Sequence, residues 1–210
     1  MHRAINGFTL ARPTVYIGRS ASPVARRCSY PTIATENLRL RAFGLADISA
    51  LVATANGHHV ADTALDLPSP FTAKSAQQWI NSHPAAWVAG DSVHWAVSVL
   101  TDDRFAGYIC LQNIDLEERQ GELAFWIGAG RERVRHAIEA TQAALAFAFT
   151  TLQLDRVRAF HLVRNLLATR VLSSIGVQQE GPLEQGVHGS DWYENVIVRA
   201  ISKSDWLDSL

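Results

Sequence analysis

Histidine and cysteine are the residues of this 210-residue chain that would most readily bind zinc, and their spacing argues against a zinc site. His58 and His59 are adjacent, but no third ligand follows at the spacing that zinc sites use. Cys28 and Cys110 lie far apart and form no Cys-x-x-Cys motif, so they indicate neither a zinc site nor a disulfide framework. A reducing compartment is the expected environment for two such cysteines. We therefore expect chemistry that needs no metal.

The composition argues against two further classes of function. Hydrophobic residues make up 48% of the chain and charged residues 19%, and the formal net charge is -1. A nucleic-acid-binding domain normally carries a clustered basic face, and a membrane-spanning helix needs about 18 or more consecutive apolar residues. The sequence shows neither pattern, so we expect a protein that binds neither nucleic acid nor a membrane.

The charge is unevenly distributed along the chain. Residues 1–35 contain five arginines and no acidic residue, which leaves 19 - 5 = 14 basic and 20 acidic residues, a net charge of -6, for the remainder. Residues 1–34 are therefore predicted to be a basic, disordered extension, with the folded domain at 35–206. An acid-free, arginine-containing N-terminus is also typical of a mitochondrial transit peptide. The expected location is cytoplasmic, or mitochondrial if the extension is such a peptide.

Hydrophobic periodicity predicts the elements that must position any site. The stretch 38–42 alternates apolar residues with arginine, as a half-buried strand does. Apolar residues then recur at helical spacing over residues 48–55 and 72–82, with Thr72 as the expected N-cap. The remaining elements are three meander strands, a long helix, a strand, a short helix and two strands, over residues 93–100, 105–114, 121–128, 136–152, 155–163, 166–175, 177–180 and 192–201. This order indicates an α/β domain with an antiparallel centre.

Six segments add a more specific signal. They are TENLRLRAFGLADISAL at Thr35–Leu51, SPFTAKSAQQWI at Ser69–Ile80, ELAFWIG at Glu122–Gly128, HAIEA at His136–Ala140, LQLDRVRAFHLVRN ending at Asn165, and RVLSSIGVQQEG at Arg170–Gly181. In order and spacing they resemble GNAT superfamily N-acetyltransferases, especially the RimJ/RimL-like branch. The resemblance implies a mixed, mostly antiparallel sheet with flanking helices. It also implies a V-shaped cleft between two central parallel strands, here 122–128 and 155–163.

The resemblance implies an enzyme that uses acetyl-CoA as co-substrate. It would move an acetyl group to a primary amine, on a protein N-terminus or a small molecule, by direct attack in a ternary complex, as a monomer or homodimer. Backbone groups of Phe125, Trp126 and Ile127 are expected to hold the pantetheine arm and polarise the thioester, since preorganised N–H donors stabilise an oxyanion. Asn165 matches an asparagine that contacts this arm, and it would serve equally well as a helix N-cap.

The expected pyrophosphate loop departs from the family pattern. That pattern consists of Arg or Gln, two variable residues, Gly, one variable residue, and Gly or Ala. Aligned without gaps, this chain has Glu132 at the first position and Ala137 at the last. Arg135 stands at the required glycine, and Arg133 stands where the family has a second glycine. Three interpretations stay open, and in one of them the arginines simply form a solvated surface. In another, CoA is bound by Arg131, Arg133, Val134, Arg135, His136 and Ala137, and the guanidinium groups neutralise the phosphates. Alternatively Arg135 blocks the loop, and the protein is a non-catalytic acyl-CoA-binding or interaction module.

A carboxylate is the first candidate for removing the proton from the attacking amine. Glu122 opens the central strand, where the resemblance places a carboxylate that faces the acceptor, and a general base can act directly or through a water. His94 and His161 are weaker candidates on neighbouring strands. The tyrosine that some relatives use as general acid falls at Leu172, so this phenolic acid is absent.

Overall fold

The computed structural model describes residues 14–16, 29–57, 60, 70–181, 184–188 and 192–209. Most of the predicted N-terminal extension lies outside these ranges, as do Cys28, His58 and His59. The extension contains two short strands, Thr14–Tyr16 and Thr32–Ala34, which pair with each other. The sheet therefore includes residues before Thr35, where the domain was expected to begin.

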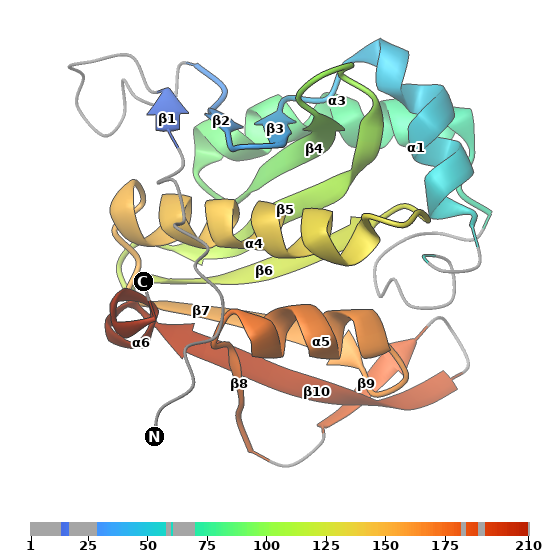
Figure 1. The fold of residues 1–210 in the computed structure, drawn as a ribbon. Coiled ribbons are helices and arrows are strands. Elements are labelled where there is room, and N and C mark those ends of the chain that lie inside the picture. Colours follow the sequence, from blue (N-terminus) through green and yellow to red (C-terminus); the bar gives the residue numbers. More distant parts are fainter. Residues whose placement is uncertain are drawn as a thin grey trace, which may run out of the picture.

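The described strands form one ten-stranded sheet (Figure 1). Its order is β1-β2-β3-β4-β5-β6-β7-β10-β8, and β9 pairs with β10. In chain order the strands are β1 (Thr14–Tyr16), β2 (Thr32–Ala34), β3 (Leu38–Arg41), β4 (Val93–Val99), β5 (Phe105–Asp115), β6 (Gln120–Ile127), β7 (Arg156–Leu162), β8 (Gln178–Gln179), β9 (Glu184–His188) and β10 (Trp192–Ser202). All pairs are antiparallel except β6 with β7, which is parallel. The predicted mixed, mostly antiparallel sheet is confirmed.

Helices cover both faces of this sheet (Figure 1). The 3-10 helix η2 (Leu45–Asp47) leads into α1 (Ile48–Ala55), which packs with α3 (Ala73–Ala89) against β4 and β5 on one face. On the other face, α4 (Arg133–Thr150) packs against β5, β6 and α5 (Leu166–Ser174). The last helix, α6 (Lys203–Asp208), follows β10. Among the described residues, no helix is long and apolar enough to cross a bilayer.

Strand alternation divides the core between the two faces. On β5, Ile109 and Leu111 belong to the core beneath α4, whereas Tyr108 and Cys110 belong to the core beneath α1 and α3. Successive side chains of a strand point to opposite faces, so one strand supplies both cores. On β6 the same rule places Leu123 with α4 and Trp126 with α1 and α3.

The ends of two helices differ from the sequence prediction. Thr72 caps α3 as expected, because its Oγ1 accepts a hydrogen bond from the Ser75 amide at 3.2 Å. The helix continues past Ser82 to Ala89 and ends at Gly90, whose φ of 89° suits a residue without Cβ. The long helix α4 begins at Arg133, three residues before the predicted start at His136. This earlier start places Arg133 and Arg135 inside the first helical turn.

Candidate active site

The parallel strands β6 and β7 are paired along only part of their length. Their Cα partners run from Gln120–Arg156 to Leu123–Ala159 and stop there. Strand β6 stays paired with β5 to Ile127, and β7 stays paired with β10 to Leu162. Each strand thus stays paired with its outer neighbour after the pairing between β6 and β7 has ended, so the two strands diverge. The predicted arrangement of two central parallel strands that separate at one end is confirmed.

Burial supports this divergence independently. Leu123, the last paired residue of β6, is 2% exposed. Ala124 and Phe125 follow it in the middle of a ten-stranded sheet, yet both are only half-buried, and so is Phe160 on β7. A central strand with a partner on each side normally buries such residues, so the exposure indicates that they border a gap in the hydrogen-bonded sheet.

The backbone of β6 presents polar groups to this unpaired edge. The Gly128 amide donates to the Ala106 carbonyl at 2.9 Å, which fixes the alternation of the ladder between β5 and β6. Trp126, two residues earlier and opposite Tyr108, therefore directs its amide and carbonyl toward β5. Phe125 and Ile127 direct theirs away from β5, toward the edge that β7 leaves. Of the three predicted contacts, these two offer free backbone donors.

The first turn of α4 lies at the end of the loop that follows β6. Glu132 is the N-cap residue and makes no side-chain capping bond, and the first turn contains no acidic residue. The first N–H groups of a helix lack intrahelical acceptors and carry the positive end of its dipole. The main-chain amides of Val134 and Arg135 belong to this turn. The loop's positive φ, 151°, falls on Gly130, which leaves open space where a Cβ would be.

The three arginines of this region have different environments. Arg131 and Arg135 are exposed, and the Arg135 Nη2 contacts Glu132 Oε1 at 2.6 Å. Arg133 is half-buried; burial lowers the pKa of its guanidinium, and its Nε has no hydrogen-bond partner. Arg135 is not among the residues with positive φ. The backbone strain expected of an arginine at a glycine position is therefore absent.

Cations beside a helix N-terminus are unfavourable by roughly 0.3–1 kcal/mol each unless an anion is present. Arg135 already has the Glu132 carboxylate as its partner, whereas Arg133 lies in the first turn of α4 with no acidic residue in that turn. Together with the orphaned Nε of Arg133, this arrangement fits a pyrophosphate, which would neutralise the charge and accept from the free amides.

The side chains of His136 and Ala137 point into the protein. His136 is 5% exposed and Ala137 is fully buried. Burial lowers the pKa of His136, so the ring is neutral near pH 7 and its 3.4 Å contact with Glu132 is not an ion pair. These two residues can therefore contribute to an anion site only through the start of the helix that they build.

Asn165 caps α5, as one of the two sequence interpretations predicted. Its Oδ1 accepts a hydrogen bond from the Ala168 amide at 3.1 Å. Capping uses only the oxygen, so the amide nitrogen can still donate to a ligand. The residue lies three positions after the last residue of β7, near the end of the strand that diverges from β6.

Glu122 is held between two neighbouring strands. Its Oε2 accepts from Asn113 Nδ2 at 2.8 Å, and its Oε1 lies 3.3 Å from Arg158 Nη2. The side chain is 17% exposed. Glu122 sits one residue before the last β6–β7 pair, so its carboxylate lies where the strands begin to part. The role of Glu122 as a base stays a prediction, and its position at this point is what the structure adds.

The two histidine candidates occupy different environments. His94 lies on the α1 and α3 face, with its ring nitrogens 2.8 Å from Ser92 Oγ and Tyr108 Oη. It stacks on His83 with ring centroids 4.2 Å apart. Burial lowers the pKa of His94 to about 4. His161 is 3% exposed; its Nδ1 lies 3.0 Å from the Leu162 carbonyl and its Nε2 accepts from Arg199. Both of its ring nitrogens are engaged, so His161 does not serve the site.

Several residues of the site were not identified from the sequence. Asn113 and Arg158 contact Glu122 from β5 and β7, and Gly130 provides the turn before α4. The Gly-Ala-Gly at 128–130 was the available signal for the turn. Leu172, at the position of the family tyrosine, is 1% exposed in the core. No group of three potential metal ligands occurs among the described residues.

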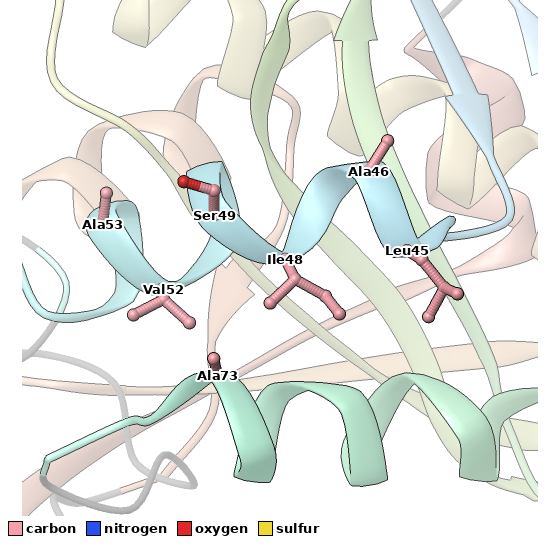
Figure 2. A pocket seen from close by; sticks show the side chains of 7 residues that line it. All are labelled: Leu45, Ala46, Ile48, Ser49, Val52, Ala53 and Ala73. Atoms are coloured by element: carbon pink, nitrogen blue, oxygen red, sulfur yellow. The ribbon is translucent and has the colours of Figure 1, made fainter.

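A shallow apolar groove lies elsewhere, between α1 and α3 (Figure 2). Its volume is about 570 Å³, and its lining consists of Leu45, Ala46, Ile48, Ser49, Val52, Ala53 and Ala73. Figure 2 shows Leu45, Ile48 and Val52 pointing from η2 and α1 toward α3. The groove shares no residue with the site around Glu122 and contains no titratable side chain.

Comparisons with known proteins agree with this geometry. Residues 37–178 match the family model described as Acetyltransferase (GNAT) domain. The chain is 27% identical over 108 residues to YdaF of Bacillus subtilis, an N-acetyltransferase by name; the match covers 51% of this chain and 59% of YdaF. RimJ of Mycobacterium smegmatis, in complex with CoA-disulfide, matches with a TM-score of 0.72 at 20% identity, covering 80% of this chain and 83% of RimJ. Spermidine N-acetyltransferase of Vibrio cholerae, in complex with CoA and spermine, matches with a TM-score of 0.69 at 20% identity, covering 81% and 98%.

Proposed function

Because the chain belongs to the GNAT acetyltransferase family, we propose that it transfers the acetyl group of acetyl-CoA to a primary amine by direct attack in a ternary complex. The observation that carries this proposal is the divergence of β6 and β7 next to Glu122. It frees backbone donors on β6, and the loop after the same strand ends in the arginine-rich start of α4.

The chain's own groups would bind acetyl-CoA along these features. The pantetheine arm would run along the free edge of β6, where the N–H and C=O groups of Phe125 and Ile127 face away from β5. An N–H donor there would polarise the thioester carbonyl. The pyrophosphate would lie at the N-terminus of α4, with Arg131 and Arg133 supplying positive charge. The amide nitrogen of Asn165 would donate to the arm from the β7 side.

The proposed reaction is a simple acyl transfer. The acceptor's ammonium group first gives one proton to solvent, which leaves a neutral amine. The neutral amine nitrogen attacks the thioester carbonyl carbon, and the carbon–sulfur bond breaks as the tetrahedral intermediate collapses. Glu122 accepts the proton that the amine loses, directly or through a water. The CoA thiolate takes up a proton from solvent, because Leu172 occupies the position where some relatives carry a phenolic acid.

Two acceptor classes fit this chemistry. A protein N-terminus and a polyamine each present a protonated primary amine, which a carboxylate attracts. A solved structure of similar fold is a spermidine N-acetyltransferase in complex with spermine, and the resemblance to RimJ/RimL-like proteins favours a protein N-terminus. We propose a primary amine as the acceptor group, and the experiment below tests a peptide N-terminus and a polyamine separately.

The proposal is tested by measuring thiol release from acetyl-CoA with three acceptors: a peptide with a free N-terminus, the same peptide with a blocked N-terminus, and spermidine. Turnover with the free peptide or with spermidine, and its loss by about 100-fold or more in Glu122→Gln, is the expected result. The matched control is Glu117→Gln, which changes an exposed glutamate in the β5–β6 turn and should leave turnover unchanged.

Calorimetry with CoA distinguishes the proposed enzyme from a non-catalytic acyl-CoA-binding module. CoA binding without turnover of any acceptor would indicate the non-catalytic acyl-CoA-binding module, whose basis in the sequence is Arg135 at a glycine position. Absence of CoA binding would contradict both functions.

A further inference from the structure

The carboxylate of Glu122 has two hydrogen-bonding neighbours that no sequence motif indicated. Asn113 lies nine residues before Glu122 and Arg158 lies 36 residues after it. They approach from opposite sides, Asn113 from β5 and Arg158 from β7. Each contacts a different oxygen of the carboxylate. The three residues form a polar cluster at the point where β6 and β7 part.

The position of Asn113 depends on a β-bulge. Gln112 pairs with Glu122 and Asp115 pairs with Gln120, so three steps along β5 match two steps along β6. In a regular ladder, Asn113 would point to the face opposite Gln112 and Glu122. The extra residue lets its side chain reach Glu122 instead. Bulges commonly re-aim a side chain next to an active site.

The backbone of Asn113 is unusual for a residue with a side chain. Its φ is 48°, in the left-handed region that non-glycine residues rarely adopt. Asparagine tolerates this conformation better than most residues, and glycine would adopt it without cost. The sequence nevertheless places an asparagine there, and the amide of that asparagine donates to Glu122 at 2.8 Å. Such an outlier next to a candidate base points to a functional contact.

Arg158 completes the arrangement from the diverging strand. Its Nη2 lies 3.3 Å from Glu122 Oε1, and its Cζ lies 5.6 Å from the centre of the Phe160 ring. The guanidinium therefore lies between Glu122 and a half-buried aromatic residue of the unpaired part of β7. Its Nε is buried without a hydrogen-bond partner. The contact with Phe160 fixes the side chain in the direction of Glu122.

We propose that Asn113 and Arg158 are positioning residues that hold the Glu122 carboxylate in the orientation needed to take the proton from the acceptor amine. This inference rests on the proposed function. Each neighbour engages one oxygen, so the plane of the carboxylate is set from both sides. Loss of either neighbour leaves Glu122 in place but free to rotate, and it therefore lowers kcat rather than the affinity for acetyl-CoA.

The test for Asn113 is the variant Asn113→Gly, which keeps the positive φ and removes only the amide. We expect kcat to fall about tenfold with an unchanged KM for acetyl-CoA. The matched control is Gln153→Gly, which relieves a similar φ of 59° in an exposed turn and should leave kcat unchanged. An equal loss in both variants, or no loss in Asn113→Gly, overturns the role of Asn113.

The test for Arg158 compares Arg158→Gln with Arg158→Lys. We expect Arg158→Gln to lower kcat about tenfold, and Arg158→Lys to recover part of the loss because it keeps the charge. Arg156→Gln is the control, since Arg156 lies on the same strand and pairs with Glu180 instead. A raised KM for the amine with unchanged kcat would make Arg158 a substrate-binding residue and overturn its positioning role.

A double-mutant cycle distinguishes positioning from general stabilisation. If Asn113 acts through Glu122, Asn113→Gly has no further effect in the Glu122→Gln background, because interacting residues are not additive. The same tenfold loss in both backgrounds overturns the inference. The assay uses acetyl-CoA with the free peptide or spermidine, whichever the wild-type enzyme turns over. Wild-type protein without turnover refutes the proposed function, whereas an active wild type with additive variants refutes only the positioning role.

Discussion

The two faces of the sheet are packed with different chemistry. Under α4 the core is apolar: Phe147, Phe149 and Leu145 are almost fully buried among small alanines, and Phe147 packs edge-on against Trp95. Under α1 and α3 the core mixes aromatic rings with histidines, and His83 is buried although neither ring nitrogen has a hydrogen-bond partner.

This difference suggests that one face contributes mainly to the free energy of unfolding and the other carries the candidate catalytic residues. The largely apolar core under α4 anchors the helix whose first turn carries the arginines. The other face carries Glu122 together with buried groups that change their charge with pH. We therefore expect substitutions under α4 to lower the free energy of unfolding most, and changes of pH to act mainly through α1 and α3.

The largest expected effect is on the apolar face. Phe147 is fully buried against Trp95 and Trp87, so Phe147→Ala should lower the free energy of unfolding by about 3–5 kcal/mol. Urea unfolding followed by circular dichroism measures the change. Val88→Ala removes a side chain that is 63% exposed on α3 and should stay within about 0.5 kcal/mol of wild type. Equal losses in the two variants would contradict the apolar-core assignment.

The second prediction concerns the loss of stability at acid pH that His83 and His94 cause on the α1 and α3 face of the sheet. Burial lowers the pKa of His83 to about 3 and that of His94 to about 4, and the nearby His94 lowers the pKa of His83 further. Both rings are neutral in the folded state near pH 7, whereas in the unfolded chain they take up protons below about pH 6.5. The folded state is therefore unaffected above pH 6.5 and loses stability as the pH falls toward 4. Each ring contributes about 2 kcal/mol of this loss between pH 6.5 and 5.

The variant His83→Phe sharpens this expectation. Phenylalanine keeps a ring to stack on His94 but takes up no proton, so the loss of stability between pH 7 and pH 5 should become smaller by about 2 kcal/mol. Urea midpoints at the two pH values measure it. The remaining dependence reflects His94, His136 and His161, whose pKa values burial also lowers. An unchanged pH dependence in His83→Phe would show that the His83–His94 pair is not its source.

The third prediction compares two arginines at the edge of the α4 face. Arg133 is half-buried with an orphaned Nε, whereas Arg135 is exposed and paired with Glu132. Arg133→Gln should weaken CoA binding about tenfold, and Arg135→Gly, which restores the family residue, should change it by about threefold or less. Calorimetry at low and high salt measures both, and CoA affinity should fall with added salt. A larger effect at Arg135 than at Arg133 would reverse this assignment.

The smallest effect is expected at Asn165, which caps α5. Asn165→Ala should lower the free energy of unfolding by about 1 kcal/mol. Asn165→Asp keeps the capping oxygen but loses the amide nitrogen, so it should preserve stability and weaken CoA binding. Thermal melting and calorimetry on both variants separate the two roles. If Asn165→Asp binds CoA as wild type does, Asn165 is only a cap.

The sequence predicted much of the fold because its signals are local. The alternation at residues 38–42, the helical spacing of α1 and the caps at Thr72 and Asn165 each depend on neighbouring residues, and the structure confirms them. The parallel pair β6 and β7 was predicted from the resemblance to a family and is confirmed with its early end. The placement of Glu122 at that end follows from the same alignment.

The sequence by itself therefore determined the order of the elements from β3 to β8, the family and the strand that carries the candidate base, but it missed β2, β9 and α6. Tertiary structure decided what surrounds that base. Arg158 reaches Glu122 only because β7 lies beside β6, and Asn113 reaches it only through a bulge whose position depends on the pairing of β5 with β6. It also decided which arginine is half-buried, since burial depends on where α4 begins and on what packs around its first turn. Periodicity reports which face a residue occupies, whereas contacts between distant strands depend on pairing and register.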